Sequence, residues 1–189
     1  MNCRQVRGCV VTASVCALAF SFGVPGFKAR AEQSRHHEAH EHGVAHLNVA
    51  VEGPDLYLEL TSPAANIVGF EHSPRTDAQK ATVKKAVDTL KDGEAMVVLP
   101  TGAQGWLADC TVDTNIDSEK THDEAHENEG HSEFTAEYHF VCKHPEKLEH
   151  VDVMFIRAFS GIERIEVQLL TGKKQTALEL TAKTSRISF

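Results

Sequence analysis

The sequence predicts an α+β fold, in which a mainly antiparallel β-sheet of about eight strands is covered by one main helix. Most of the chain after residue 44 alternates apolar with polar residues, the period of a strand with one buried face. Residues 76–90 instead place apolar residues at helical spacing. Cys110 and Cys142 predict one disulfide between two of the strands.

A β-hairpin is predicted at the start of the alternating region. Residues 47–51 and 56–60 each place an apolar residue at every second position, and Glu52-Gly53-Pro54-Asp55 forms the turn between them. The segment that follows, residues 62–70, shows no regular period, so we expect a packed corner there.

One helix is predicted over residues 76–90. Thr76 has the character of an N-cap, with Gln79 three residues later, as in a capping box. Asp92-Gly93 provides a stop signal.

The second half predicts a meander of strands joined by short turns. The strands are expected at residues 95–99, 107–116, 134–142, 151–159, 163–170, 175–181 and 186–189.

A disulfide between Cys110 and Cys142 would fix the register of one hairpin. The exported setting inferred below is oxidising, and neither residue belongs to the Cys-x-x-Cys pattern of zinc sites, so we prefer a disulfide to a thiolate metal site. If the two cysteines are opposite each other, Val112 meets Phe140 and Thr114 meets Tyr138, which keeps apolar side chains on one face.

The domain organisation begins with a predicted signal peptide at residues 1–31. Arg4 and Arg7 precede an apolar run, and Ala29-Arg30-Ala31 supplies small residues for cleavage near Ala31. We expect a flexible histidine-rich arm at residues 32–43 and a single α+β metal-binding domain at residues 44–189, with a loop rich in histidine and acids at 119–133. The predicted location is the periplasm.

The charge balance excludes several classes of partner. The formal net charge is −8, and removal of residues 1–31 makes it −12. Such a chain does not neutralise phosphates, so nucleic acid is excluded as a partner. After the signal segment, no apolar stretch is long enough to span a membrane.

Histidine is the most informative residue type. All 12 histidines follow residue 31, and many alternate with acids. Neutral imidazole is the commonest metal ligand in proteins, so this composition predicts metal binding. Solvated polar segments without metal are the alternative.

We divide the candidate ligands into two sets. The candidates for a tight site are histidines in or near the sheet and arm histidines that can fold back onto it: His40, His42, His46, His72, His139, His144 and His150. The candidates for weaker sites lie in the arm and the loop, where binding must offset the entropy of ordering the chain: His36, His37, His122, His126 and His131.

Enzyme signatures are absent from the sequence. There is no His-Glu-x-x-His, Gly-x-Ser-x-Gly or phosphate-binding glycine loop. We therefore expect no catalysis, although a zinc hydrolase with scattered ligands is an alternative.

Several stretches resemble the ZrgA-like family of zinc-regulated periplasmic proteins. They are His40-Glu41-His42-Gly43, residues 47–53, the block from Ser62-Pro63-Ala64-Ala65-Asn66 to Phe70-Glu71-His72, residues 142–145 and residues 161–168. The resemblance covers most of the chain after the signal segment. It implies zinc binding at His42 and His72 and zinc acquisition in Gram-negative bacteria beside a zinc ABC transporter.

Together these observations predict a periplasmic protein that captures Zn²⁺ for uptake without catalysis. Its expected partners are the zinc ion and a zinc ABC transporter or the binding protein of that transporter. The alternatives are a secreted zinc-dependent hydrolase and a periplasmic copper or nickel buffer.

Overall fold

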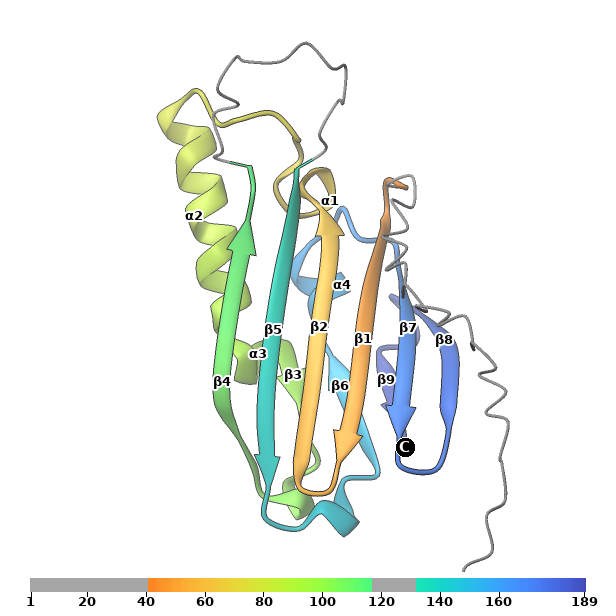
Figure 1. The fold of residues 1–189 in the computed structure, drawn as a ribbon. Helices are drawn as coiled ribbons and strands as arrows, with labels where there is room; N and C mark the ends of the chain where they lie inside the picture. Colours follow the sequence, from red (N-terminus) through yellow and green to blue (C-terminus); the bar gives the residue numbers. More distant parts are fainter. Residues whose placement is uncertain (1–40, 117–131) are drawn as a thin grey trace, which may run out of the picture. The chain divides into compact units, whose positions relative to one another are not determined.

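A computed structural model describes residues 41–116 and 132–189, which form two β-sheets and four α-helices (Figure 1). The predicted signal peptide, most of the arm and most of the histidine loop lie outside these residues. The strands are β1 (Val44–Glu52), β2 (Asp55–Pro63), β3 (Val97–Val98), β4 (Gly105–Thr114), β5 (Glu133–Cys142), β6 (His150–Val153), β7 (Arg164–Thr171), β8 (Gln175–Thr181) and β9 (Arg186–Ser188). The helices are α1 (Ala64–Val68), α2 (Asp77–Lys91), α3 (Gly93–Met96) and α4 (Phe155–Ala158), with 3₁₀ turns at Thr101–Ala103 and Pro145–Lys147.

The large sheet has the strand order β4-β5-β2-β1-β7-β8. The predicted hairpin is present, since β1 and β2 pair antiparallel around the turn at Gly53 and Pro54. The prediction of an antiparallel sheet with a meander in its second half is wrong, because β7 pairs in parallel with β1. The chain reaches β7 by a long crossover, as a parallel pair requires. An alternating apolar pattern shows that a strand has a buried face and does not show the direction of its neighbour.

The small sheet has the order β3-β6-β9 and was not predicted as a separate sheet. The expected strand at residues 95–99 begins in the last turn of helix α3, which Asp92 caps, and only Val97–Val98 form a strand. The expected strand at residues 151–159 ends at Val153, and the chain continues into α4. The prediction of one main helix is therefore wrong, and the fold is mostly β. A short apolar run does not distinguish a buried strand from a helical turn.

Helix α2 forms where the sequence predicts a helix. The hydroxyl of Thr76 accepts a hydrogen bond from the backbone N–H of Gln79, and the Gln79 side chain accepts one from Thr76 N–H, so the capping box is complete. The helix buries Val83, Ala86 and Leu90. The hydroxyl of Tyr138 donates to the carbonyl oxygen of Leu90 at 2.8 Å, which ties the end of the helix to the sheet.

The predicted disulfide is absent. Cys110 is opposite Tyr138, four residues from Cys142, so the register around Cys110 is shifted by four residues from the predicted one. A register irregularity between Leu107 and Asp109 then places Cys142 opposite Gly105, and both thiols are free. Four residues of strand span roughly 13 Å, whereas bonded cysteines need Cα atoms about 4.4–6.8 Å apart. The apolar pattern did not expose this error, because a shift by an even number leaves each side chain on the same face.

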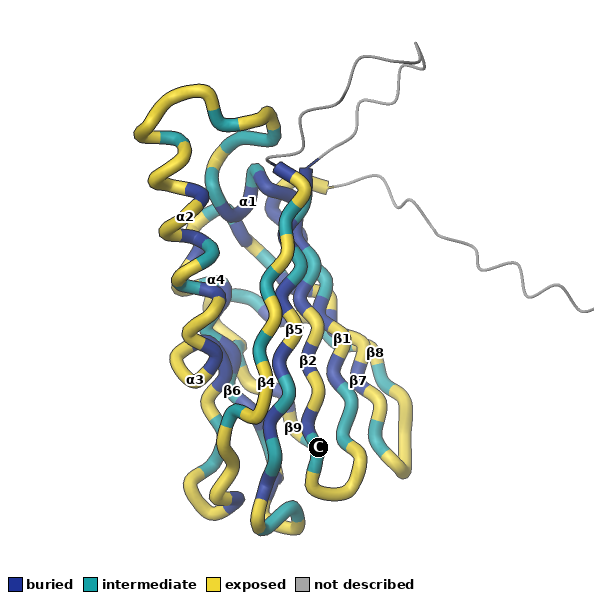
Figure 2. The backbone as a smooth tube through the Cα atoms, turned by 60° about the vertical axis from the view of Figure 1, so that its left-hand side comes forward, coloured by how far each residue is buried: buried dark blue, intermediate teal, exposed yellow. Residues whose placement is uncertain are grey.

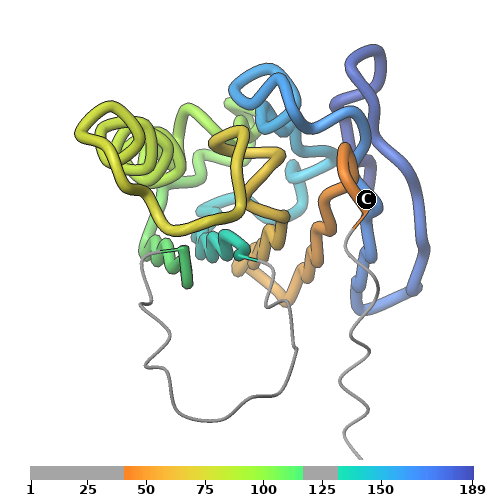
Figure 3. The backbone as a smooth tube through the Cα atoms, turned by 90° about the horizontal axis from the view of Figure 1, so that it is seen from above, coloured from red at the N-terminus to blue at the C-terminus, as the bar shows by residue number. Residues whose placement is uncertain are grey.

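All the described helices and the small sheet lie on one side of the large sheet (Figure 3). The side chains on this side form the core, in which the rings of Tyr138 and Phe155 pack with centroids 5.9 Å apart. Along each central strand, buried residues alternate with more exposed ones (Figure 2). The large sheet thus has a core face and an open face. None of the described helices is long and apolar enough to cross a membrane.

Candidate metal-binding site

Five strand ends meet at one edge of the large sheet. Pro63 at the end of β2 is opposite Glu133 at the start of β5, Thr114 at the end of β4 is opposite Phe134, and Val44 at the start of β1 is beside Arg164. We call this the upper edge (Figure 1). Residues 41, 116 and 132, where the described chain stops, adjoin these ends. Both histidine-rich segments of the sequence therefore attach at the same edge.

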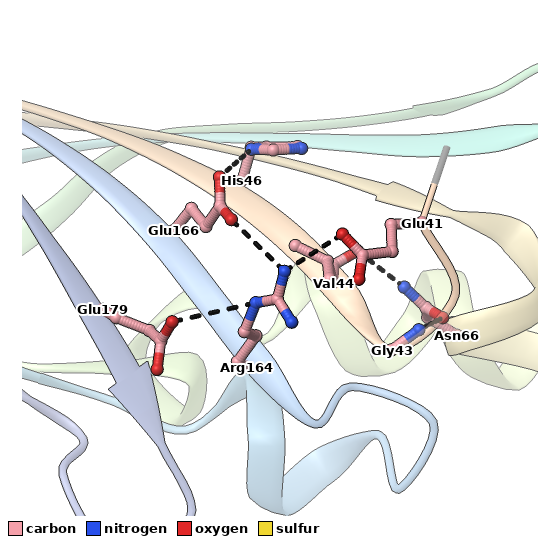
Figure 4. A network of polar contacts seen from close by, with 8 residues as sticks. All are labelled: Glu41, Gly43, Val44, His46, Asn66, Arg164, Glu166 and Glu179. Carbon is pink, nitrogen blue, oxygen red and sulfur yellow. Dashed lines mark hydrogen bonds and ion pairs between the residues drawn. The ribbon is translucent and has the colours of Figure 1, made fainter. Parts of the chain in front are cut away.

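A buried asparagine holds the first strand at this edge. The amide oxygen of Asn66, on α1, accepts from Gly43 N–H at 2.8 Å, and its amide nitrogen donates to the carbonyl oxygen of Val44 at 2.8 Å (Figure 4). Asn66 is only 4% exposed. A Cβ atom on Gly161 would lie 2.5 Å from the Asn66 carbonyl oxygen, so glycine is needed for this close packing. The contacts fix the backbone directly after His42.

Gly43, which follows His42, has a left-handed backbone conformation that other residues rarely adopt. Gly43 has a φ of +84°, and its carbonyl oxygen accepts hydrogen bonds from the N–H groups of Glu163 and Arg164 at 2.7 and 3.1 Å. The turn therefore joins the start of β1 to the start of β7 and sets the direction in which His42 leaves the sheet.

His42 and Glu71 form the central pair of the candidate site. The imidazole Nε2 of His42 lies 3.3 Å from the carboxylate Oε1 of Glu71, and the exposed fractions of the side chains are 71% and 22%. The carbonyl oxygen of Glu71 accepts from the hydroxyl of Ser132 at 2.7 Å, and the carbonyl oxygen of Ser132 accepts from Ala64 N–H at 2.8 Å. Glu71 is thus held by the residue at which the histidine loop rejoins the fold.

His72 follows Glu71 and is exposed. Its ring stacks on Phe70 with the centroids 5.0 Å apart, and its Nδ1 lies 3.0 Å from the carbonyl oxygen of Ser73. Because a carbonyl oxygen only accepts, Nδ1 carries the proton in this contact, which leaves the Nε2 lone pair of a neutral ring available to a metal.

His46 lies on the open face, two strand positions from the upper edge. Its Nδ1 is 3.7 Å from a carboxylate oxygen of Glu166. Arg164 joins the same network, with ion pairs to Glu166 at 3.5 Å, Glu41 at 3.0 Å and Glu179 at 3.8 Å (Figure 4). The parallel pairing of β1 with β7 places His46 beside Glu166.

The other described histidines lie away from the upper edge. His139 stacks on Tyr57 on the open face and contacts the carboxylate of Asp55 at 2.7 Å. His144 follows the far end of β5, with its Nδ1 3.4 Å from Glu146. His150 begins β6 in the small sheet, opposite Ser188.

The candidates for a tight site are therefore not gathered in one place. In residues 41–116 and 132–189, no three His, Cys, Asp or Glu side chains lie close enough together to hold a metal ion. His36, His37, His40, His122, His126 and His131 lie outside the described residues. Within the described part, the structure brings His42 next to Glu71 and places His72 beside Glu71 in the chain.

Three residues that shape this edge were not among the predicted site residues. Glu71 pairs with His42, Ser132 holds Glu71, and Asn66 holds the strand start. The sequence could have pointed to Asn66, because it is an amide within a segment of small and apolar residues, and a buried amide needs hydrogen-bond partners. No local signal marks Ser132, because its partner is 61 positions away in the sequence.

Comparison with known proteins gives one relevant finding. A family model described as "ZrgA family zinc uptake protein" matches residues 39–189. A search of the curated proteins finds no match.

Proposed function

The chain belongs to the ZrgA family of zinc uptake proteins, and from this membership we propose that it captures Zn²⁺ in the periplasm and passes it on for import. Zinc uptake is the process in which the family takes part. The periplasmic location rests on the signal-like segment at residues 1–31, and the capture of zinc rests on the histidines and on the upper edge.

The pair of His42 and Glu71 is the observation that supports zinc capture best. Imidazole nitrogen and carboxylate oxygen are both good zinc ligands, and two ligands of a tetrahedral zinc ion lie about 3.3 Å apart. The distance between His42 Nε2 and Glu71 Oε1 is 3.3 Å. The pair therefore has suitable spacing for two corners of a zinc tetrahedron.

The remaining corners need ligands from near this pair. His72 directly follows Glu71, and within residues 41–116 and 132–189 its contacts are made by the ring face and by Nδ1. His40 precedes His42 by two residues in the sequence, and the loop that carries the other histidines connects Ile116 to Ser132. We propose His40 or a loop histidine, together with His72, as the further ligands.

The proposed role is binding and delivery without catalysis. The expected recipient is a zinc ABC transporter or the binding protein of that transporter. Cobalt substitution tests this view, because Co²⁺ absorption reports coordination number. A closed tetrahedral spectrum agrees with a binding protein, whereas an open position that takes up added anions would favour a hydrolase.

Competition with a zinc chelator tests the site directly. The double variant H42A/E71Q should lose at least about tenfold in Zn²⁺ affinity, because it removes both proposed ligands. The matched control is H144A/E146Q, which removes a similar pair with a separation of 3.4 Å at the far end of the sheet and should keep the native affinity.

Equal losses in the two double variants would contradict the proposal, and so would no loss in H42A/E71Q. Thermal unfolding of both variants without zinc would show whether a loss of affinity comes from loss of the fold.

A further inference from the structure

The open face of the large sheet is strongly acidic. The strand alternation places the following carboxylates on it: Asp55, Glu59, Asp109, Asp113, Glu137, Glu166 and Glu179. Arg164 is the one Lys or Arg side chain that the described strands place on the same face, and it is engaged by Glu41, Glu166 and Glu179. The side of the face formed by β2, β4 and β5 therefore carries carboxylates that no lysine or arginine on this face offsets.

Two of these carboxylates are placed against each other. Glu59 and Glu137 are directly opposite across β2 and β5, and both are exposed. Like charges at such positions destabilise a sheet. Asp109 lies one strand further, opposite His139, and adds a third carboxylate to this part of the face. A sheet that keeps this arrangement on an exposed face has a local cost that a cationic ligand would remove.

The same face is hollowed and partly apolar. A hollow of about 620 Å³ is lined by Tyr57, Ala50 and Leu170 together with Glu59, Asp109 and Glu137. Tyr57 and Leu170 are 42% and 50% exposed, so this face presents apolar as well as acidic surface. Trp106, which is 49% exposed, lies opposite Val141 on the same face. Among the described elements, no helix or strand covers this surface (Figure 3).

We propose that this face docks a basic, amphipathic segment of a protein partner. Lysine or arginine side chains of the segment would lie among Glu59, Asp109 and Glu137, and its apolar side chains would contact Tyr57 and Leu170. The charge of the face selects this occupant. A second copy of the chain would bring the same acidic face, and an anionic membrane would also be repelled.

The proposal is independent of zinc capture. It uses neither His42 nor Glu71, which lie at the upper edge. A negative result here therefore leaves the zinc site untouched, and the Zn²⁺ affinity of the variants below serves as an internal check.

Titration of the ¹⁵N-labelled protein with synthetic octapeptides tests the proposal. The probe alternates lysine with leucine and alanine, one control peptide carries glutamate for lysine, and another carries serine for leucine. The basic amphipathic probe should shift amide signals of β2, β4, β5 and β7 on the open face. The glutamate peptide should give no shifts, and the serine peptide should bind more weakly, because it lacks the apolar contacts.

Two double variants test whether Glu59 and Glu137 are the carboxylates that bind the probe. E59Q/E137Q should weaken binding of the basic probe about tenfold at low salt. The control E94Q/E149Q removes the same charge at exposed positions away from the sheet face and should not change the affinity. E59Q/E137Q should also unfold at a higher temperature than the native protein, because the repulsion between the two carboxylates is gone.

For E59Q/E137Q we thus expect weaker peptide binding together with a higher unfolding temperature, and this combination distinguishes a docking surface from a merely structural one. The proposal would be overturned if the amide shifts spread evenly over all surface acids. It would also be overturned if the two double variants lost binding equally, or if the serine peptide bound as tightly as the basic probe. Binding of spermidine or Zn²⁺ at Glu59 and Glu137 with no binding of the peptide would also overturn it.

Discussion

At the scale of single residues, the upper edge depends on a buried amide. Asn66 binds Gly43 and Val44 through both ends of its side chain and also donates to the hydroxyl of Ser62 at 3.3 Å. Backbone pairing of β1 with β2 begins at His46, and the Asn66 bonds hold the chain before that point. The position of His42 therefore depends on Asn66, although Asn66 itself is too deeply buried to serve as a metal ligand.

Replacement of Asn66 by alanine should destabilise the fold by about 2–4 kcal/mol, because Gly43 N–H and the Val44 carbonyl lose their buried partners. Urea unfolding would measure this change, and zinc affinity should fall with it because the start of β1 loosens. The control N48A removes an exposed asparagine of β1 and should change stability by no more than about 0.5 kcal/mol. Equal effects of the two substitutions would show that Asn66 has no special role.

The cysteines give a second prediction at this scale. Burial raises the pKa of Cys110, with a further increase from Asp109, and burial also raises the pKa of Cys142. Both thiols should therefore react slowly with iodoacetamide at neutral pH in the folded protein. After denaturation without reductant, peptide mass spectrometry should find both residues alkylated. A peptide linked through Cys110 and Cys142 would show that the register of β4 and β5 differs from the one described.

At the scale of elements, the sequence predicted what local chemistry determines. The capping box at Thr76 and Gln79 marks the start of α2, and the alternation in β1 and β2 marks the first hairpin, because a few neighbouring residues specify each of them. The parallel neighbour of β1 and the four-residue change of register in β4 depend on distant contacts. The same limit applies to the site, since His42 was predicted as a ligand but its pairing with Glu71 follows from the tertiary fold.

The link between β6 and β9 gives a prediction on pH. The guanidinium of Arg186 donates to both oxygens of Asp152 at 2.8 and 2.7 Å, and these hydrogen bonds lower the pKa of Asp152. A carboxylate with a lowered pKa contributes stability above its unfolded pKa of about 3.9, and this stability is lost as the pH falls through the folded value. D152N should therefore be less stable than the native protein at pH 7.

The stability difference between D152N and the native protein should shrink near pH 3, because the native carboxylate is then increasingly protonated. Urea unfolding midpoints of both proteins at pH 7 and pH 3 measure this difference. A difference that stays constant between them would mean that the charge of Asp152 does not stabilise the small sheet.

At the scale of the whole molecule, we propose separate tasks for two surfaces. The upper edge receives both histidine-rich segments and holds the proposed zinc pair, while the open face carries the acidic hollow proposed for a partner. Both are set by the mixed sheet, which places the start of β1 beside the start of β7. The family match extends over residues 39–189, and so includes both surfaces.

Zinc affinity should depend steeply on pH. An imidazole must be neutral to bind, and free histidine titrates near pH 6.5, so protons compete with the metal. With three imidazoles the affinity should fall between pH 7.5 and 5.5, approaching about a thousandfold per pH unit at the acid end. Chelator competition in constant salt measures this profile. A flat profile would mean that carboxylates, which titrate near pH 4, hold the metal.

The central claim is that zinc binds at the upper edge, and a crystal structure of the zinc-loaded protein with anomalous data at the zinc absorption edge tests it most directly. The account predicts an anomalous peak bonded to Nε2 of His42 and to the carboxylate of Glu71, with further imidazole ligands completing a tetrahedron. A fully occupied zinc ion bound only elsewhere, for example at His139 and Asp55 or at His144 and Glu146, would contradict it.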